Sequence, residues 1–335
     1  MSDQQYVSPL ISSFPDIIGM QLPCKYRPRR PIGRGAYSTV WSLINNETGD
    51  TVVGKLADLS QMSEDNQNFA RSEAQNIRQL DHPNIIKLFD TYERDHKLLH
   101  VLEYADAGDL LTQVEVRTRS KGAEGGPAYY QQDELLVILS QLCLAIEYIH
   151  DRRIMHRDLK TPNVMLMKVG LIKLGDFGFS RKYDESVSNN VGNTFCGTPY
   201  YLAPELWRQQ PYSYKADIWS LGVMCYELMT LGKPFPAADL DGLMQRVCQQ
   251  GSYEPLPADR YSADLIQLVE RMLTVNPDQR PSIKEVLHHP VVSGRGLELI
   301  KINVRRLRNL EVSVADRIVA EVDRVQAEVR AASQK

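Results

Sequence analysis

Apolar residues are spaced differently in the first third of the chain than in the rest of it. Short apolar runs that end at turn residues predict strands over 36–43, 51–56 and 98–103. Glu73, Ile77 and Leu80 follow one another at spacings of four and three, which predicts a helix over 64–80. Beyond Gly108 the pattern is helical, most clearly over 135–150, 216–230, 240–248 and 264–273. A strand-rich part followed by a helix-rich part predicts two unequal lobes.

The last part of the chain carries two amphipathic runs. The first consists of Leu297, Ile300, Val304 and Leu307, and the second of Ile318, Val322, Val325 and Val329. Helices that pack back on their own domain and helices of a short coiled coil share this spacing, so both arrangements remain open. The two runs are out of heptad phase with each other. Ser313, with Asp316 three residues later, predicts the cap at which the second helix begins.

Two stretches show no sustained period. Residues 1–25 mix Ser, Gln and Pro with apolar pairs such as Ile17-Ile18, and predict a flexible extension that docks through its few hydrophobic residues. Residues 117–133 are rich in glycine and charge, and predict an exposed loop between two helices.

The overall composition excludes several classes of protein. The chain has 335 residues with 42 acidic against 39 basic, so its net charge of −3 argues against a nucleic-acid binder. Five cysteines without CxxC or Cys/His ligand spacing indicate neither a disulfide framework nor a zinc site. The most apolar window, 135–149, is polar at Ser140, Gln141 and Glu147 and too short to span a membrane, so it predicts a buried helix. With no signal segment at the N-terminus, we expect an intracellular protein.

Two features of the first lobe suggest phosphate chemistry. Gly33 and Gly35 lie where a strand turns back, and glycines there let backbone N–H groups approach phosphates closely. Ordinary hairpins also carry two glycines, so the loop alone is weak evidence. Lys55 lies inside the apolar run 51–56, where a buried ammonium needs a counter-charge, and Glu73 follows 18 positions later on the predicted helix. A lysine that points from an edge strand into water is the alternative.

Three short motifs follow in order in the second lobe. They are HRDLKTPN at 156–163, DFG at 176–178 and APE at 203–205. Each alone is weak, but coincidence does not explain the ordered set together with the glycine loop and the strand lysine. Over residues 26–290 the chain therefore resembles the eukaryotic protein kinase family.

This resemblance implies an α+β fold with two lobes. A small β-rich N-lobe with one main helix is expected over about 26–104 and a larger α-helical C-lobe over about 105–290, flanked by the extension 1–25 and a helical tail over 291–335. The implied activity is transfer of the γ-phosphoryl group of ATP to a protein substrate. The alternative is a pseudokinase that only binds partners, but such a chain would normally lack Lys55, Asp158 or Asp176, and all three are present. A dinucleotide oxidoreductase is excluded, since no acidic residue follows the glycine loop at the spacing that fold needs.

Phosphoryl transfer depends mostly on positioning and on neutralising charge. The resemblance implies that Asp158 orients the substrate hydroxyl and accepts its proton, and that Lys160 neutralises the γ-phosphate. It implies that Asn163 and Asp176 hold Mg²⁺, with Mn²⁺ as an alternative, since hard cations take oxygen ligands.

The resemblance also places the nucleotide. Lys55 is implied to hold the α/β-phosphates and to pair with Glu73, and Leu102 to stand behind the adenine. The implied nucleotide-binding residues are Ile32, Gly33, Arg34, Gly35, Ala36, Tyr37, Ser38, Val40, Lys55, Leu102, Glu103, Ala105, Asp109 and Met165. Ser38 replaces the third glycine of the family's loop and Val53 its usual alanine, two departures that bear on ATP affinity.

Other positions match structural parts of the family. Asp217 is expected to brace the catalytic loop and Arg280 to pair with Glu205. His156 and Phe177 are expected to stack with Ile77 and Leu88 in the family's internal hydrophobic column. Thr194 matches an activation-loop phosphorylation site, and its phosphate would be bound by Arg157 and Arg181.

Lys160, with the Gly-Thr-Pro run at 197–199, resembles the serine/threonine class. The local stretches at 82–86, 173–178 and 195–205 are most similar to the NIMA-related kinases. This resemblance implies a role in the cell cycle or at a cilium or flagellum. It implies a cytoplasmic protein associated with the cytoskeleton, a centrosome or a basal body. The expected partners are ATP, a protein substrate and a second copy bound through the C-terminal helices, with no nucleic acid and no membrane span.

Overall fold

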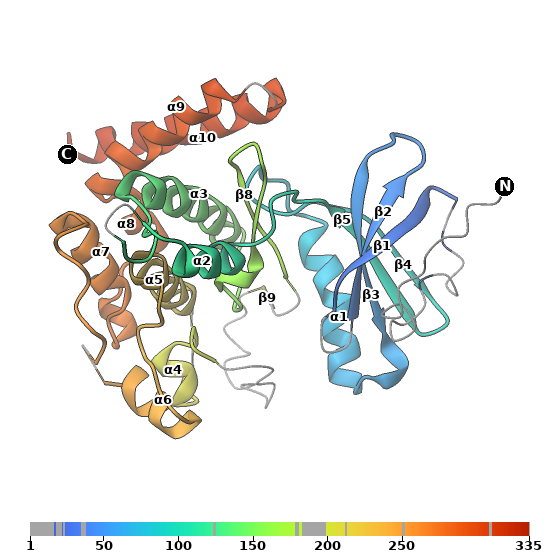
Figure 1. Ribbon diagram of the computed structural model, residues 1–335, viewed down its shortest axis with the longest axis horizontal. Coiled ribbons are helices and arrows are strands. Elements are labelled where there is room, and N and C mark those ends of the chain that lie inside the picture. The colour runs from blue at the N-terminus through green and yellow to red at the C-terminus, as the bar shows by residue number, and fades with distance from the viewer. Residues whose placement is uncertain are drawn as a thin grey trace. The chain divides into compact units, whose positions relative to one another are not determined.

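The computed structural model describes residues 17, 22, 24–34, 38–122, 125–177, 181–182, 199–211, 213–249, 252–307 and 310–334 (Figure 1). Seven of these are described by their backbone only: Gln61, Asp65, Phe69, Ser72, Glu73, Arg181 and Lys182. The chain forms two compact units. Met1–Gln79 with Lys87–Tyr104 make the first, called the N-unit here, and Leu80–Ile86 with Ala105–Lys335 make the second, called the C-unit.

The N-unit is built on an antiparallel five-stranded sheet of order β1-β2-β3-β5-β4. Its strands are β1 (Tyr26–Arg34), β2 (Ser38–Asn45), β3 (Thr51–Asp58), β4 (Leu88–Arg94) and β5 (Lys97–Glu103). The single-turn helix η3 (Leu59–Gln61) and helix α1 (Glu64–Ile77) connect β3 to β4, and α1 packs on β4 and β5. The predicted strands correspond to β2, β3 and β5, and the predicted helix to α1, which ends three residues earlier than expected.

Part of the N-terminal extension belongs to the N-unit core. Ile17 is fully buried against Trp41, Leu43 and Val101, and Leu22 packs against the same cluster. Burying an aliphatic side chain stabilises a fold by about 1.5–3 kcal/mol. For these two described residues, the predicted docking of the extension through its hydrophobic side chains is confirmed.

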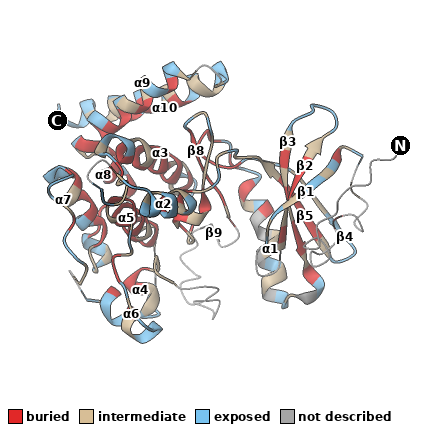
Figure 2. Ribbon diagram, viewed as in Figure 1, coloured by how far each residue is buried: buried red, intermediate tan, exposed pale blue. Residues whose placement is uncertain are grey.

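The C-unit is mostly helical. Its helices up to residue 288 are α2 (Leu110–Arg119), α3 (Gln132–Asp151), α4 (Pro204–Trp207), α5 (Lys215–Thr230), α6 (Leu240–Val247), α7 (Ala263–Met272) and α8 (Ile283–His288). Helices α3 and α5 are buried along most of their length (Figure 2), and for α3 the apolar window at 135–149 predicts this. The expected two-lobed α+β fold, with a β-rich unit carrying one main helix and a helical unit, is confirmed.

Short strands in the C-unit carry the candidate catalytic segments. Strand β6 (Ile154–Met155) pairs with β9 (Arg181–Lys182), and β7 (Val164–Leu166) pairs with β8 (Ile172–Leu174). A 3-10 turn, η4 (Thr161–Asn163), precedes β7. The motif residues 156–163 therefore lie between β6 and β7, and Asp176 follows β8.

The predicted exposed loop over 117–133 is shorter than expected. Helix α2 continues to Arg119 and α3 already begins at Gln132. The Arg117 guanidinium lies 3.8 Å from the centre of the Tyr130 ring, and Tyr130 is buried. The buried Tyr130 ring thus anchors the end of this segment.

No helix in the described part of the chain combines the length and apolar character needed to cross a membrane.

The C-terminal tail packs against the preceding helices of the C-unit. One π-helical turn, η7 (Val291–Gly296), leads into α9 (Leu297–Arg306), and α10 (Val312–Ala332) lies beside α9 (Figure 1). Ile318, Val322 and Val325 are buried, so of the two arrangements left open the structure contains the one that packs back on the domain. The predicted cap at Ser313 is wrong. Helix α10 begins two residues earlier than that cap implies, at Val312, with Glu311 as the N-cap residue and no side-chain cap bond.

Candidate active site

A buried carboxylate holds the backbone of the segment between β6 and η4. Asp217, in the first turn of α5, accepts hydrogen bonds from the backbone N–H groups of His156 (2.9 Å) and Arg157 (2.9 Å), and from Nε2 of His150 (2.8 Å). Burial alone would raise the pKa of Asp217, but the His150 hydrogen bond and the neighbouring donors outweigh it, and the pKa lies below its usual value. The predicted bracing role of Asp217 is confirmed. The contribution of His150 was missed by sequence reasoning, and a histidine in the last turn of a buried helix was its one signal.

Two residues of the site have left-handed backbone conformations. The φ angle is +68° at Arg157 and +57° at Asp176. Residues other than glycine adopt this region at a cost of about 1–2 kcal/mol, so the surrounding contacts must enforce it. Asp217 does so for Arg157, since it binds the N–H of that residue. Such strain is concentrated at functional sites in proteins, which supports the assignment of both segments to the site.

Asp158, Lys160 and Asn163 form one constellation. Nζ of Lys160 lies 2.8 Å from Oδ2 of Asp158, and Nδ2 of Asn163 donates to that same oxygen (2.9 Å) and to the Asp158 carbonyl (2.8 Å). Burial raises the pKa of Asp158, and the Lys160 ammonium counteracts part of that shift. The Lys160 ammonium and the Asn163 amide N–H groups both favour the charged carboxylate and fix its orientation, as a group that accepts a proton requires.

His156 and Phe177 connect the two motifs. Nδ1 of His156 accepts from the Asp158 N–H (3.3 Å), so Nε2 carries the proton and donates to the Gly175 carbonyl (3.0 Å). Burial lowers the pKa of His156, which keeps the ring neutral. The ring also packs edge-on against the buried Phe177, with 4.7 Å between centroids. Of the predicted hydrophobic column, the structure contains the contact between His156 and Phe177.

The donor set fits a hard divalent cation. Asn163 uses its amide N–H groups on Asp158, which leaves its amide oxygen as the atom that a cation would take. Asp176 supplies a carboxylate on the residue after Gly175. No cluster of three or more His, Cys, Asp or Glu side chains suited to a metal occurs among the described residues. Two protein oxygens, completed by phosphate and water oxygens, are the arrangement that Mg²⁺ commonly takes in nucleotide sites.

A second polar network lies behind the catalytic segment, and sequence reasoning missed it. Oγ1 of the buried Thr161 lies 2.8 Å from the Tyr201 hydroxyl and 3.2 Å from Oε2 of Glu227, and the Tyr201 hydroxyl donates to the same oxygen (2.5 Å). Nζ of Lys233 pairs with Oε1 of Glu227 (2.5 Å), and burial lowers the pKa of Lys233. The network therefore ties Thr161, the residue after Lys160, to Tyr201, two residues before the motif at 203–205.

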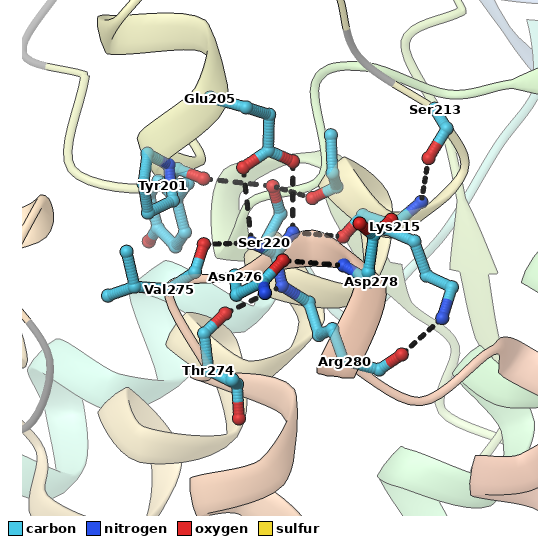
Figure 3. A network of polar contacts seen from close by, with 12 residues as sticks. Tyr201, Glu205, Ser213, Lys215, Ser220, Thr274, Val275, Asn276, Asp278 and Arg280 are labelled. Carbon is cyan, nitrogen blue, oxygen red and sulfur yellow. Dashed lines mark hydrogen bonds and ion pairs between the residues drawn. The ribbon is translucent and has the colours of Figure 1, made fainter.

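The pair between Glu205 and Arg280 is buried and bidentate (Figure 3). The two N–O distances are 3.0 and 3.1 Å, and the guanidinium also donates to the carbonyls of Thr274, Lys215 and Val275. Both side chains are almost fully inaccessible to solvent. The predicted pairing is confirmed. It attaches the start of α4 to the segment before α8.

The candidate nucleotide residues of the N-unit lie on neighbouring strands. Gly33 of β1 is opposite Val40 of β2, and Val40 is opposite Lys55 of β3. Leu102, on β5, is opposite Val53. Ile32 and Arg34 are exposed, and Ser38 begins β2. Gly35, Ala36 and Tyr37 lie outside the described residues, as does the side chain of Glu73, so its pairing with Lys55 stays a prediction.

The remaining nucleotide candidates lie at the end of β5 and in the C-unit. Glu103 ends β5 and Ala105 begins the second part of the C-unit. Asp109 is the N-cap of α2: its carboxylate accepts from the Thr112 N–H (2.8 Å) and hydroxyl (2.9 Å). Asp109 also bridges to Met165 of β7, which places these two residues side by side. Thr194 and the side chain of Arg181 lie outside the described residues.

Comparison with known proteins agrees with this site. The family model described as protein kinase domain matches residues 26–292. Putative serine/threonine-protein kinase A of Trypanosoma brucei brucei is 41% identical over 302 residues, which are 90% of this chain and 68% of that protein. Serine/threonine-protein kinase Nek1 of Mus musculus is 35% identical over 81% of this chain and 22% of its own length, and Nek8 of Danio rerio is 36% identical over 80% and 37%. The chain therefore belongs to the protein kinase family, as a serine/threonine kinase of the NIMA-related group.

Proposed function

We propose that the chain transfers the γ-phosphoryl group of Mg-ATP to serine and threonine hydroxyls of protein substrates through Asp158, Lys160, Asn163 and Asp176. One observation carries the proposal. Lys160 and Asn163 converge on a single oxygen of Asp158, at 2.8 and 2.9 Å, which leaves the other oxygen to meet a substrate hydroxyl. A scaffold that only binds partners has no need of this arrangement.

Each of these residues has a role that follows from its charge and its donor or acceptor atoms. Asp158 takes the proton of the attacking hydroxyl, and its orientation is held by Asn163 and by the braced backbone of Arg157. Lys160 is placed to neutralise charge on the transferred group. Asn163 and Asp176 would hold the metal ion, Mg²⁺ or in its place Mn²⁺, which when bound neutralises the phosphate oxygens. On the N-unit, Lys55 would hold the α/β-phosphates, with Glu73 as its counter-charge.

Phosphotransfer by the Asp158→Asn variant tests this proposal. The asparagine keeps the shape of the side chain but cannot accept a proton, so we expect kcat to fall by about 10²–10⁴-fold with an unchanged fold. Asp151→Asn makes the same chemical change at an exposed residue that pairs with Lys284, and its kcat should equal that of the wild type. Turnover of Asp158→Asn close to the wild-type value would refute the proposal. An inactive wild-type protein that still binds ATP would favour the pseudokinase alternative.

The proposed activity includes a switch at Thr194. A phosphate there brings nearly two negative charges, and it would be bound by Arg157 and Arg181. Support comes from Arg157, which stands beside the catalytic Asp158 on a strained, braced backbone. Phosphatase treatment should lower kcat/KM of the wild type to the level of Thr194→Ala. Equal activity of the two untreated proteins would place the switch elsewhere.

Cellular role and assembly extend the proposal. Similarity to NIMA-related kinases supports a cell-cycle or ciliary role and a cytoplasmic location at the cytoskeleton, a centrosome or a basal body, which imaging of the tagged protein tests. Self-association through the C-terminal helices requires that the apolar face at Ile318, Val322 and Val325 leave its present packing. Sedimentation of the full chain as a monomer at micromolar concentration would reject that assembly.

A further inference from the structure

Helix α10 is fixed to the rest of the C-unit by ion pairs as well as by its apolar face. Arg324 donates to Oε2 of Glu147 at 2.5 Å, and Glu147, on α3, is only 1% exposed. Lys301 of α9 pairs with Asp323 at 2.7 Å. A buried carboxylate needs a counter-charge, so the contact with Arg324 selects one docked position for α10 rather than a sliding hydrophobic contact.

The first half of α10 contacts the segment 81–86. This segment belongs to the C-unit, although it follows the N-unit residues up to Gln79 in the sequence. Arg317 donates to the Asp81 carboxylate (3.2 Å) and to the Asp81 carbonyl (2.8 Å). The Glu321 carboxylate lies 2.9 Å from Nε2 of His82, whose side chain is 1% exposed. Nδ1 of His82 accepts from the Asn84 N–H (3.0 Å), so Nε2 carries the proton and donates to Glu321.

The same segment is bonded to the strand that precedes Asp176. The Asn84 carbonyl accepts from the Leu174 N–H (2.8 Å), and the Ile86 N–H donates to the Leu174 carbonyl (2.9 Å). The Asn84 side chain donates to the Ile172 carbonyl (3.0 Å). Ile86 also packs on Gly175: a Cβ added there would lie 3.4 Å from Cγ1 of Ile86. Residues 84–86 thus hold β8 in place through hydrogen bonds to Ile172 and Leu174.

We propose that α10 is a positioning element of the kinase site: Glu321, through His82, holds residues 82–86 against β8 and so fixes Gly175 and the left-handed backbone of Asp176. A left-handed φ such as that of Asp176 persists only where the surrounding contacts enforce it. His156 and Asn163 give one support, since they bond to the carbonyl and the N–H of Gly175. The segment held by α10 gives the other. The importance of Asp176 for turnover rests on the proposed function, whereas the coupling of α10 to β8 does not.

Two alanine variants of the full chain test the coupling. Glu321→Ala removes the partner of a buried imidazole N–H, and alanine preserves helix propensity. Asp323→Ala is the matched control, since it removes an acidic side chain on the same helix that contacts Lys301 and not residues 81–86. Amide hydrogen exchange is measured in peptides that cover 82–86, 172–177 and 314–330, and kcat and KM are measured for both variants.

We expect exchange at Ile86 and Leu174 to accelerate about five- to hundredfold in Glu321→Ala and less than about twofold in Asp323→Ala, which matches the loss of one partner of a buried donor. We expect kcat to fall while KM for ATP changes little. In Glu321→Gln, whose amide oxygen still accepts from His82, part of the protection should return. Unchanged exchange at 82–86 and 172–177 in Glu321→Ala would overturn the proposal, whether or not α10 itself loosens. If the wild type proves inactive, the exchange result still decides the coupling, so the two failures are distinguishable.

Discussion

The carboxylate of Asp217 provides the strongest test of how the catalytic segment is held. Its two oxygens accept three hydrogen bonds, from His150, His156 and Arg157, within a distance range of 2.8–2.9 Å. In Asp217→Asn one oxygen becomes an NH₂ group, which must face a donor in either orientation. The best orientation sacrifices the Arg157 N–H, because the other oxygen accepts two of the three bonds.

The expected cost follows from these contacts. A buried donor without a partner costs about 1–3 kcal/mol, and the two remaining bonds lose their charge, about 1 kcal/mol each. Relaxation of the left-handed Arg157 returns about 1 kcal/mol of this. We therefore expect the free energy of unfolding to fall by about 2–4 kcal/mol. We also expect kcat to fall about tenfold or more, since Asp158 follows directly on the loosened residue.

Urea unfolding followed by circular dichroism measures the first quantity, with Asp151→Asn as the control. A loss below about 0.5 kcal/mol in Asp217→Asn would refute the reasoning. The pH dependence gives a second check. The pKa of Asp217 is lower in the folded protein than in the unfolded chain. Ionised Asp217 therefore stabilises the fold at any pH above the ordinary carboxyl pKa, and this stabilisation is lost as the pH falls through the pKa of the folded state. Asp217→Asn should therefore lose less stability than the wild type below about pH 4.

Three further predictions address other parts of the structure. Arg280→Leu should lower the free energy of unfolding by about 3–5 kcal/mol, because it leaves Glu205 buried without a partner, and the double variant Arg280→Leu/Glu205→Leu should recover part of that loss in urea titrations. Ile17→Ala should lower the free energy of unfolding by about 2–4 kcal/mol in the same titrations. An unchanged free energy of unfolding would mean that the N-terminal extension is not part of the core. Lys160→Met should raise the pKa of Asp158 further, since the Lys160 ammonium lowers it in the wild type. A pH titration followed by carboxyl ¹³C NMR measures this pKa, and a lower pKa in the variant would contradict the geometry.

The sequence predicts the parts of the fold that have a clear period. Strands β2, β3 and β5 and the helices α3, α5, α6 and α7 are recovered from apolar spacing. Strand β1 is not, because Pro28 and Pro31 interrupt it and charged residues alternate with them, which is typical of an edge strand. The start of α10 is misplaced because a Ser-x-x-Asp pattern can also fall inside a first helical turn.

The sequence likewise predicts some residues of the site and not others. Motif spacing identifies Asp158, Asn163 and Asp176, because their chemistry requires fixed residue types in a fixed order. The supporting network around Thr161, Glu227 and Lys233 is invisible in the sequence, because its members come from separate segments that only tertiary packing brings together. The docking of α10 on His82 is of the same kind: 239 positions separate His82 from Glu321.

The most direct test of the central claim is phosphotransfer from Mg-ATP to a degenerate peptide library, followed by identification of the phosphorylated amino acid. The account predicts phosphoserine and phosphothreonine, and loss of both products in Asp176→Ala. Phosphotyrosine as the main product, or full activity of Asp176→Ala, would contradict it.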